Sequence, residues 1–542
     1  MPNDPVGVLI IGAGASGAAF AWRIADAGMS VLCLEQGPRT TQADYPTNHL
    51  DWESRAATDW SSNPNVRLAE RDPQVHGMPA DYPVNETDTP ISPLMFNAVG
   101  GSTIAWAAHF PRLKPRDFRV RSDDGVADDW PLDYDTLDPY FALNDQMMGV
   151  SGLAGDPAYP RHQPPLPPLP FGAIGNTLAR GFEQLGWHWW PSDTAILSSD
   201  YNGREACINL GPCTSGCSHG ARASTDITYW PIAERKGVEL RTGCRVKEIT
   251  LNDEGMASGV LYYDEDGVLQ EQLAELVVVA TNGIGTPRLL LNSANERHPN
   301  GLANSSGLVG KNLMFHPVAM IGGTFDEPLE GNGPRGCSFW SHEFYDTDTS
   351  RGFVRGYGLQ MTRNGGPAGQ ALAAAARGAV PWGPAHHDRF AETYNHTAAM
   401  LALTEDLPEE TNTVTLDPTL TDSDGIPAPK VTYELSDNTR RMLDHATERG
   451  QEVLRAAGAT DTYTVPLVRQ AGWHLMGTAR MGTDPATSVV NEWGRSHDIK
   501  NLFIIDGSIF VTGGAVNPTS TIQALALHIA DSIKRNLATL FD

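Results

Sequence analysis

The residues whose types and spacing best suit a defined chemistry are three glycines in the segment Gly12-Ala13-Gly14-Ala15-Ser16-Gly17. In such a pattern Gly12 permits a tight turn, Gly14 lets a pyrophosphate approach the backbone, and Gly17 allows a helix to pack closely on a strand. The free amides and the dipole at the start of that helix favour phosphates. Glu35, at the end of the next predicted strand, is placed to accept hydrogen bonds from ribose hydroxyls. These residues predict a dinucleotide site for FAD or NAD, and the acid argues against the 2′-phosphate of NADP.

A second group that could do chemistry is a cluster of three cysteines, Cys207, Cys213 and Cys217, with the spacing Cys-x5-Cys-x3-Cys. Closely spaced thiolates in a glycine-rich loop suit an iron–sulfur cluster. Zinc would need a fourth ligand, which His219 could supply. The alternatives without a metal are a Cys213–Cys217 disulfide or thiols that pack the loop, and we expect one of these two.

The elements that must position the glycine loop form a β-turn-α-β unit. Val6–Ile11 is a continuous apolar run, typical of a strand that is buried on both faces. The loop leads into a predicted helix at Ala18–Ala27, which Gly28 ends, and a second strand follows at Ser30–Leu34. Parts of this size and order are the core of a doubly wound α/β sheet.

Further elements are predicted along the rest of the chain. The predicted strands are Val238–Thr242, Arg245–Leu251, Ser258–Tyr263, Glu275–Ala280 and Leu502–Ile505, the second and third of them forming a hairpin. The predicted helices are Pro287–Ser293, Asp437–Ala457 with Ser436 as N-cap and Gly458 as stop, and Asn517–Leu537 with Asn517 as N-cap. The Pro-rich stretch 157–172 predicts an extended surface connector. The Gly-, Ala- and Pro-rich stretch 364–387 predicts a mobile loop or lid, or a disordered spacer.

Length and composition limit the classes of protein. A chain of 542 residues predicts two domains or one large domain with insertions. The formal net charge of −26 argues against nucleic-acid and anionic-membrane partners. No uncharged apolar stretch is long enough to span a bilayer, and the first residues lack a basic leader region, so a cytoplasmic location is expected. Six cysteines are too few for a disulfide scaffold.

Several ordered segments resemble the glucose–methanol–choline (GMC) oxidoreductase family. They are Gly100-Gly101-Ser102-Thr103, Gly283–Leu291, Gly310–Pro317, Asp506-Gly507-Ser508 and Val516-Asn517-Pro518-Thr519. The resemblance extends over most of the chain, except for about 330–400, and implies FAD rather than NAD.

The resemblance also implies a fold and its division into domains. The expected fold is a Rossmann-like α/β FAD-binding domain made of residues 1–154, 200–321 and 465–542. An α+β substrate-binding domain of sheet and helices would comprise 155–199 and 322–464. The implied cofactor-binding residues are Gly12, Gly14, Ala15, Ser16, Gly17, Glu35, Gly100, Gly101, Ser102, Val246, Asp506, Gly507, Asn517, Pro518 and Thr519.

The family's catalytic base corresponds to His474 in Trp473–Gly482, and its partner to Asn517. Oxidation of an alcohol removes the hydroxyl proton and a hydride from the same carbon. A neutral imidazole, with a reference pKa of about 6.5, accepts such a proton near neutral pH. An amide orients the hydroxyl without competing for the proton. The hydride would pass to flavin N5, and the other histidines, His316 and His497 among them, are expected to be structural.

Residues that follow Gly100-Gly101 indicate how the flavin is attached and which class of substrate is oxidised. Where some family members link the flavin covalently to histidine, this chain has Ala105, so we expect non-covalent FAD; His109 is a poorly placed substitute. Trp106 resembles the tryptophan of pyranose-oxidising relatives and favours a sugar-oxidising branch. The cysteine stretch resembles gluconate, fructose and glucose dehydrogenases, some of which hold a 3Fe-4S cluster. Six aromatic side chains could line the substrate pocket, although core packing is expected for Trp187, His188, Trp189, Trp190, Phe339 and Trp340.

The resulting prediction is FAD-dependent oxidation of a primary or secondary alcohol to the carbonyl. A sugar, glycoside or polyol is the expected substrate, ahead of an aromatic (lignin-type) alcohol. The alternatives are a GMC-fold lyase and a flavin-binding protein without net alcohol oxidation. Oxygen or another acceptor would take the electrons, and a homodimer or an electron-transfer subunit is compatible with the sequence.

Overall fold

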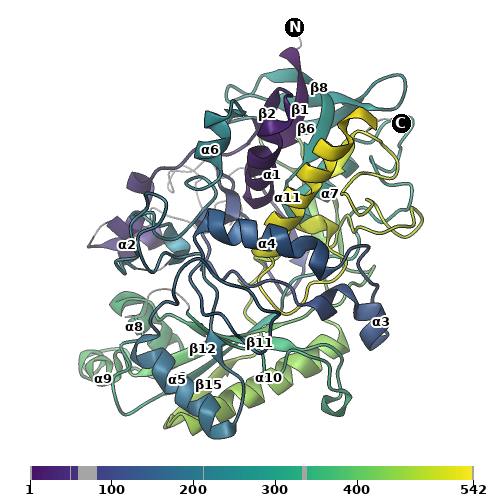
Figure 1. Ribbon diagram of the computed structural model, residues 1–542. Coiled ribbons are helices and arrows are strands. Elements are labelled where there is room, and N and C mark those ends of the chain that lie inside the picture. Colours follow the sequence, from purple (N-terminus) through teal and green to yellow (C-terminus); the bar gives the residue numbers. More distant parts are fainter. Residues whose placement is uncertain (1–2, 49, 59–81, 212, 333–337, 540–542) are drawn as a thin grey trace.

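The computed structural model describes residues 3–539 apart from 49, 59–81, 212 and 333–337. Its upper half in Figure 1 contains a seven-stranded sheet. The strands are β1 (Asn3–Ile11), β2 (Val31–Leu34), β5 (Glu239–Arg241), β6 (Arg245–Leu251), β7 (Ala257–Tyr263), β8 (Leu269–Val279) and β16 (Leu502–Ile504). They lie in the order β5-β2-β1-β8-β7-β6, and β16 pairs with β8. Because β1 lies parallel between β2 and β8, this half has the predicted Rossmann-like arrangement.

Apolar runs account for the centre of this sheet. Residues 8–10 of β1 and 276–279 of β8 are completely buried, as strands covered on both faces require. Two helices that are far apart in the sequence, α1 (Ala15–Ile24) and α11 (Thr519–Asn536), pack against each other beside the sheet. Next to them lie α4 (Tyr134–Met148) and α6 (Trp230–Arg235). The first turn of α1 is thereby held at the carboxyl end of β1.

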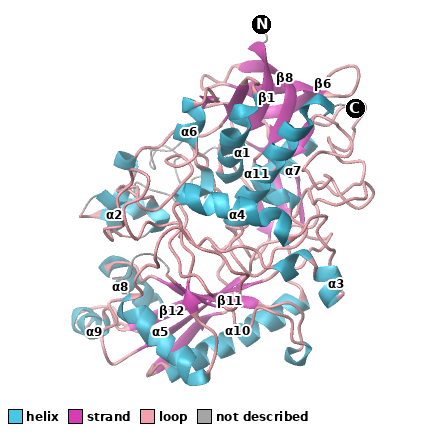
Figure 2. Ribbon diagram, viewed as in Figure 1, coloured by secondary structure: helices cyan, strands magenta, loops and turns pink. Residues whose placement is uncertain are grey.

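The lower half contains a second sheet, in which neighbouring strands are antiparallel (Figure 2). Its strands, in spatial order, are β15 (Asp461–Val465), β9 (Val318–Thr324), β12 (Thr397–Thr404), β11 (Tyr357–Thr362), β10 (Phe339–Ser341) and β4 (Trp190–Pro191). The helices α5 (Gly172–Leu185) and α10 (Asp437–Ala456) pack on it. A three-stranded sheet consists of β13 (Thr413–Thr421), β14 (Pro427–Thr432) and β3 (Asn85–Asp88). The chain is therefore a mixed α/β protein with a sheet-and-helix second half, as predicted.

Local sequence signals identified several elements closely. The predicted hairpin is formed by β6 and β7. In α10 the Thr439 N–H donates to Oγ of the predicted cap, Ser436, at 3.1 Å, and Gly458 follows the helix with a φ of 99°. The stretch 157–171 is free of helix, although it buries Tyr159, Leu166 and Leu169 and so is only partly a surface connector.

Two helices begin at residues that differ from the predicted ones. The helix α7 (Asn282–Asn292) starts well before Pro287, because Asn282 Oδ1 accepts the N–H groups of Ile284 and Gly285 at 2.9 and 3.2 Å. The helix α11 starts at Thr519 with Pro518 at its N-cap position. The prediction that Asn517 caps this helix is therefore wrong, and its side chain is available for other contacts.

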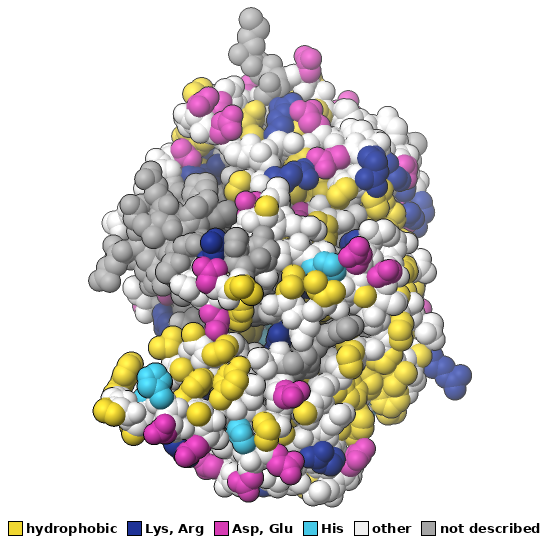
Figure 3. Space-filling view, turned by 90° about the vertical axis from the view of Figure 1, so that its left-hand side faces the viewer, with side chains coloured by type: hydrophobic (Ala, Val, Ile, Leu, Met, Phe, Trp, Pro, Cys, Tyr) yellow, Lys and Arg dark blue, Asp and Glu magenta, His cyan; other side chains and the backbone are white. Residues whose placement is uncertain are grey.

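The predicted loop or spacer at 364–387 is wrong, since this stretch contains α8 (Pro367–Ala376) and the start of α9 (His386–Thr393). Pro367 occupies the first helical turn and an alanine-rich run follows, which favours a helix. Glu53 of α2 (Trp52–Thr58) accepts the N–H groups of Ala368 and Gly369 at 3.1 and 2.8 Å. Leu372 of α8 and Trp382, between the two helices, are exposed. Figure 3 shows apolar side chains gathered on the lower part of the face that it presents.

The six aromatic residues considered for a pocket lie in and around the second sheet. Trp189 stacks on Phe339 with ring centroids 5.5 Å apart, and Trp190 and Phe339 belong to the paired strands β4 and β10. None of the six lines the main cavity. Phe339 and Trp340 are buried, and Trp187 and Trp189 pack partly buried against the core, whereas His188 and Trp190 are only half-buried. A further short helix among the described residues is α3 (Val120–Asp124). Within the described ranges, none of the helices combines the length and the apolar character that a bilayer span requires.

Candidate active site

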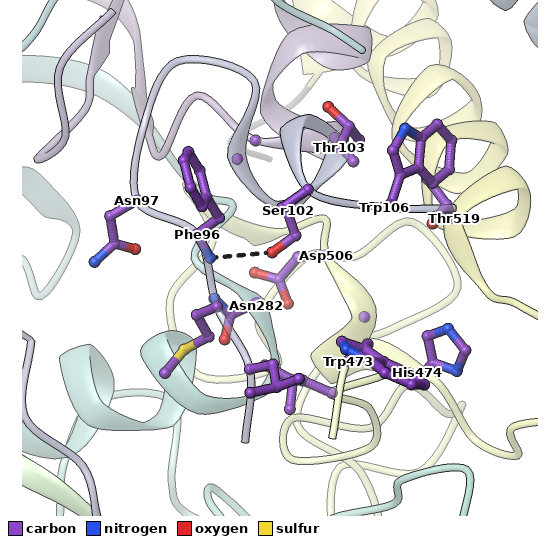
Figure 4. A pocket seen from close by; sticks show the side chains of 18 of the residues that line it. Phe96, Asn97, Ser102, Thr103, Trp106, Asn282, Trp473, His474, Asp506 and Thr519 are labelled. Atoms are coloured by element: carbon purple, nitrogen blue, oxygen red, sulfur yellow. Dashed lines mark hydrogen bonds between the residues drawn. The ribbon is translucent and has the colours of Figure 1, made fainter. Parts of the chain in front are cut away.

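A cavity of about 600 Å³ runs from the glycine loop after β1 to the ends of strands in the second sheet. One end is lined by Gly12, Gly14 and Glu35, and the other by Gln360, His474 and Asn517. Figure 4 shows Ser102, Thr103 and Trp106 on one side of this cavity and Trp473 and His474 on the opposite side. The dashed bond in Figure 4 runs from the Phe96 N–H to Ser102 Oγ at 3.3 Å.

The predicted cofactor residues are distributed unevenly around the cavity. Those that line it are Gly12, Gly14, Ala15, Ser16, Glu35, Gly101, Ser102, Val246, Asp506, Gly507, Asn517, Pro518 and Thr519. Gly17 and Gly100 do not line it. A Cβ on Gly17 would lie 2.0 Å from the carbonyl oxygen of Gly12, so this glycine allows α1 to pack against the loop. Gly100 instead donates its N–H to the Ala13 carbonyl at 3.0 Å.

Two backbones meet where Gly14 and Gly101 face each other. A Cβ on Gly101, whose φ is 53°, would lie 2.8 Å from Cα of Gly14. Gly14 is the N-cap residue of α1 and provides no side chain to cap the helix. The N–H groups in the first turn of α1 therefore point to an acceptor from outside the helix, on the side of the cavity.

Two carboxyl groups at this end are held by hydrogen bonds. Glu35 accepts the N–H groups of Ala13 and Gly37 at 2.7 and 2.8 Å, and burial raises the pKa of Glu35 to about 7. Asp506 accepts the hydroxyl of Thr286 at 2.6 Å, and burial likewise raises the pKa of Asp506. Both side chains are fixed in direction before any ligand enters.

The two residues predicted to be catalytic lie together at the far end. Nδ2 of Asn517 is 3.5 Å from Nε2 of His474. Nε2 of Gln360, on β11, donates to Oδ1 of Asn517 at 2.7 Å. Burial lowers the pKa of His474 well below its usual range, with a further contribution from the neighbouring His316. The imidazole is therefore neutral near pH 7, as a proton acceptor requires.

His316 was expected to be structural, and the structure places it in direct contact with His474. Nδ1 of His316 lies 2.7 Å from Nδ1 of His474, and Nε2 of His316 lies 2.6 Å from the carbonyl oxygen of Gly514. The sequence feature that could have identified His316 is its position in Gly310–Pro317, one of the segments that resemble the GMC family. Gln360 was not predicted as a site residue, because nothing in its local sequence distinguishes it. His497, for which a structural role was also expected, contacts the Ser488 hydroxyl at 2.9 Å.

The wall between the two ends contains the positions that bear on flavin attachment. Ala105, Trp106 and His109 all line the cavity. The Trp106 indole N–H donates to the Ala223 carbonyl at 2.9 Å, which fixes the ring. Burial lowers the pKa of His109 to about 4, and its Nδ1 has no hydrogen-bond partner among the described residues.

The cysteine cluster lies beside the cavity. Cys213 lines it, and Cys207, Cys213 and Cys217 line a smaller adjoining pocket. Cys213 and Cys217 are not joined to each other, so the alternative of a Cys213–Cys217 disulfide is wrong. Nε2 of His219 is 3.1 Å from the Ala206 carbonyl. Across the described part of the chain, no set of three or more His, Cys, Asp or Glu side chains is arranged to hold a metal ion, which leaves the iron–sulfur and zinc alternatives without support.

A Rossmann-like sheet whose cavity ends at a buried, neutral histidine and an amide defines an oxidoreductase that uses a dinucleotide cofactor. Residues 169–318 and 408–526 match the two profiles described as GMC oxidoreductase, and residues 10–69 match an NAD(P)-binding Rossmann-like domain. The chain belongs to the GMC oxidoreductase family and is an alcohol oxidoreductase.

Individual relatives match over nearly the whole chain. The 2-methyl-1,2-propanediol dehydrogenase of Mycolicibacterium austroafricanum is 43% identical over 99% of this chain and 97% of its own. The fructose dehydrogenase large subunit of Gluconobacter japonicus is 32% identical over 98% of both chains. The crystal structure of pyridoxine 4-oxidase from Mesorbium loti has a TM-score of 0.65, covers 97% of this chain and 98% of its own, and at 18% identity shows the fold alone.

Proposed function

We propose that this chain is an FAD-dependent oxidase or dehydrogenase that converts a primary or secondary alcohol to the carbonyl, with His474 as general base. The observation that carries the proposal is a single cavity that joins the glycine loop to a buried, neutral histidine with an amide beside it. A dinucleotide that lies along such a cavity brings its reactive ring to the base. This arrangement serves removal of a proton and a hydride from one carbon.

The glycine loop fits FAD. A Cβ on Gly14 would meet nothing within 4 Å except Cα of Gly101, at 3.9 Å, so the space above this residue is open to a pyrophosphate. The N–H groups at the start of α1 would bind its oxygens, and Glu35 would face the ribose. FAD, when bound, supplies N5 as the hydride acceptor. Since Ala105 has no nucleophile, we propose that FAD is held without a covalent bond.

We also propose the domain boundaries predicted above. The seven-stranded sheet falls wholly within residues 1–154, 200–321 and 465–542. The second sheet falls mostly within 155–199 and 322–464, with β9 and β15 crossing the boundaries. In this division the base, His474, belongs to the FAD-binding domain and Gln360 to the substrate-binding domain, so the alcohol would react at the junction.

The chain's own residues would bind the alcohol, orient it and take its proton. Nδ2 of Asn517 would donate to the alcohol oxygen, while Nε2 of His474 accepts the hydroxyl proton. The electron pair of the broken O–H bond then forms the carbonyl as the hydride leaves the same carbon. Burial of His474 excludes water, which would otherwise compete for the base.

For the substrate we propose a polyol or a sugar. The catalytic end of the cavity combines apolar side chains, Leu401 and Leu403, with the polar groups of Gln360 and Asn517. Such a mixture suits a small carbon skeleton that carries more than one hydroxyl group. The names of the two relatives, a diol dehydrogenase and a fructose dehydrogenase, and the presence of Trp106 support the same class.

The test is anaerobic mixing of the purified yellow protein with diols, sugars and aromatic alcohols while the flavin absorbance is followed. We expect bleaching with a polyhydroxylated alcohol, and carbonyl product in equal amount. Product without bleaching would instead indicate a lyase. Unchanged bleaching in His474→Ala would refute the proposed base.

A further inference from the structure

His316 lies behind the base rather than in the cavity. Its side chain is completely buried and does not line the cavity, whereas His474 does. Both of its ring nitrogens are engaged, one with His474 and one with the Gly514 backbone. These two contacts decide which nitrogen of each ring carries the proton.

The carbonyl of Gly514 determines the tautomer of His316. A carbonyl oxygen can only accept, so Nε2 of His316, 2.6 Å away, must be the donor. Burial lowers the pKa of His316 to about 4, so near neutral pH the ring has a single N–H. Its Nδ1 therefore has a lone pair and accepts an N–H from Nδ1 of His474, at 2.7 Å.

The contact with His316 also determines the state of the His474 nitrogen that faces the cavity. With the proton of His474 on Nδ1, and the ring neutral because it is buried, Nε2 of His474 must carry the lone pair. This nitrogen is the one that faces Nδ2 of Asn517, at 3.5 Å. It is therefore the nitrogen on the side where an alcohol would lie.

The Gly514 carbonyl, which accepts from His316, belongs to a peptide group that is itself held in place. The Ala515 N–H, which shares a peptide group with that carbonyl, donates to Oη of Tyr345 at 3.2 Å, and the Tyr345 hydroxyl donates to Asp117 at 2.6 Å. Gly514 has a φ of 60°, and a Cβ there would lie 2.6 Å from Cδ2 of Leu113. The peptide plane is thus held by hydrogen bonds on both sides and by close packing.

We propose that His316, anchored on the Gly514 carbonyl, is a positioning residue that holds His474 in the tautomer with an unprotonated Nε2. The inference rests on the proposed function, in which His474 is the base. In the other tautomer Nε2 would carry a hydrogen and could not take the hydroxyl proton. After the proton transfer His474 keeps its Nδ1–H bond to His316, whose lone pair stabilises the imidazolium.

The tautomers can be read directly by ¹⁵N NMR of protein labelled with [¹⁵N]histidine. The chain has 16 histidines, and the signals of His474 and His316 are assigned by their loss in His474→Gln and His316→Gln. We expect the proton on Nδ1 of His474 and on Nε2 of His316 near neutral pH. A proton on Nε2 of His474 would overturn the proposal, whatever the activity of the enzyme.

A pair of variants separates positioning from packing. In His316→Gln an amide oxygen can accept from His474 while the amide NH2 donates to Gly514, whereas His316→Leu keeps a similar volume without either bond. We expect His316→Leu to slow flavin reduction by the alcohol about 100-fold at little change in KM, and His316→Gln to recover to within about tenfold of the natural enzyme. Equal losses in the two variants would refute positioning.

A double variant distinguishes failure of this inference from failure of the proposed function. If His316 acts through His474, then His316→Leu has no further effect on the rate in the His474→Gln background. An additional loss there would refute the proposal. If His474→Gln alone leaves flavin reduction unchanged, the proposed function fails. If His474→Gln is inactive while His316→Leu is as fast as the natural enzyme, only the positioning role fails.

Discussion

Replacement of Gln360 tests whether the orientation of the Asn517 amide governs the reaction. Nε2 of Gln360 donates to Oδ1 of Asn517 at 2.7 Å, which leaves Nδ2 of Asn517 facing His474 at 3.5 Å. An amide turned by 180° would present its oxygen to the base and to the substrate hydroxyl instead. The hydrogen bond from Gln360 selects between these two orientations.

The expected loss of rate follows from the hydrogen bonds to Asn517 that each substitution changes. One such bond contributes about 1 to 1.5 kcal/mol. Gln360→Leu therefore makes the two orientations of Asn517 comparable and slows the reaction about twofold, because about half of the molecules then present the wrong group. Gln360→Glu is nearly isosteric, but its carboxylate can only accept and so attracts Nδ2 of Asn517. A hydrogen bond to a charged acceptor favours this reversed orientation by about 1.5 to 3 kcal/mol, which corresponds to a rate about 10- to 100-fold lower.

The assay is the rate constant of anaerobic flavin reduction, with Met361→Leu on the same strand as a matched control. Packing alone predicts that the isosteric Gln360→Glu is tolerated better than Gln360→Leu, whereas orientation predicts the opposite order. A protonated carboxyl group can donate again, so the Gln360→Glu variant should become faster as the pH falls through the pKa of that group. A faster reaction in Gln360→Glu than in Gln360→Leu at alkaline pH would refute the reasoning.

Three further predictions concern the base, the cofactor loop and the buried charges. Because burial lowers the pKa of His474 and the neutral ring is the active form, kcat/KM should stay flat as the pH falls through about 6.5 and decline only below it; a midpoint at or above that value would contradict this. Gly101→Ala, whose Cβ would lie 2.8 Å from Cα of Gly14, should purify with little flavin, as its absorption spectrum would show; full flavin content would count against the proposed site. Arg355→Met would leave the buried carboxylates of Asp117 and Glu405 without a cation and should lower the free energy of unfolding by about 3 to 5 kcal/mol in denaturant titration. A loss below about 1 kcal/mol would mean that these ion pairs add little to stability.

The sequence by itself determined the features that depend on neighbouring residues. The Gly12–Gly17 loop is recognisable because a tight turn, a phosphate approach and a helix start must follow one another within a few residues. The apolar runs of β1 and β8 are recognisable because a strand buried on both faces needs them. The cap of α10 by Ser436 is equally local, since its bond reaches only to Thr439. These signals were sufficient to predict the Rossmann-like half and the position of the glycine loop within it.

Only the tertiary structure decided how the base is held. His316 and His474 are 158 residues apart in the chain, and Gln360 and Asn517 are 157 apart, so no local pattern relates them. Asn517 has the residue type of an N-cap, yet its side chain contacts Gln360 because packing of the second sheet brings a donor within 2.7 Å. The protonation site of a histidine depends on whether a donor or an acceptor lies against each nitrogen. That relation exists only once β9, β11 and the segment around Gly514 have come together.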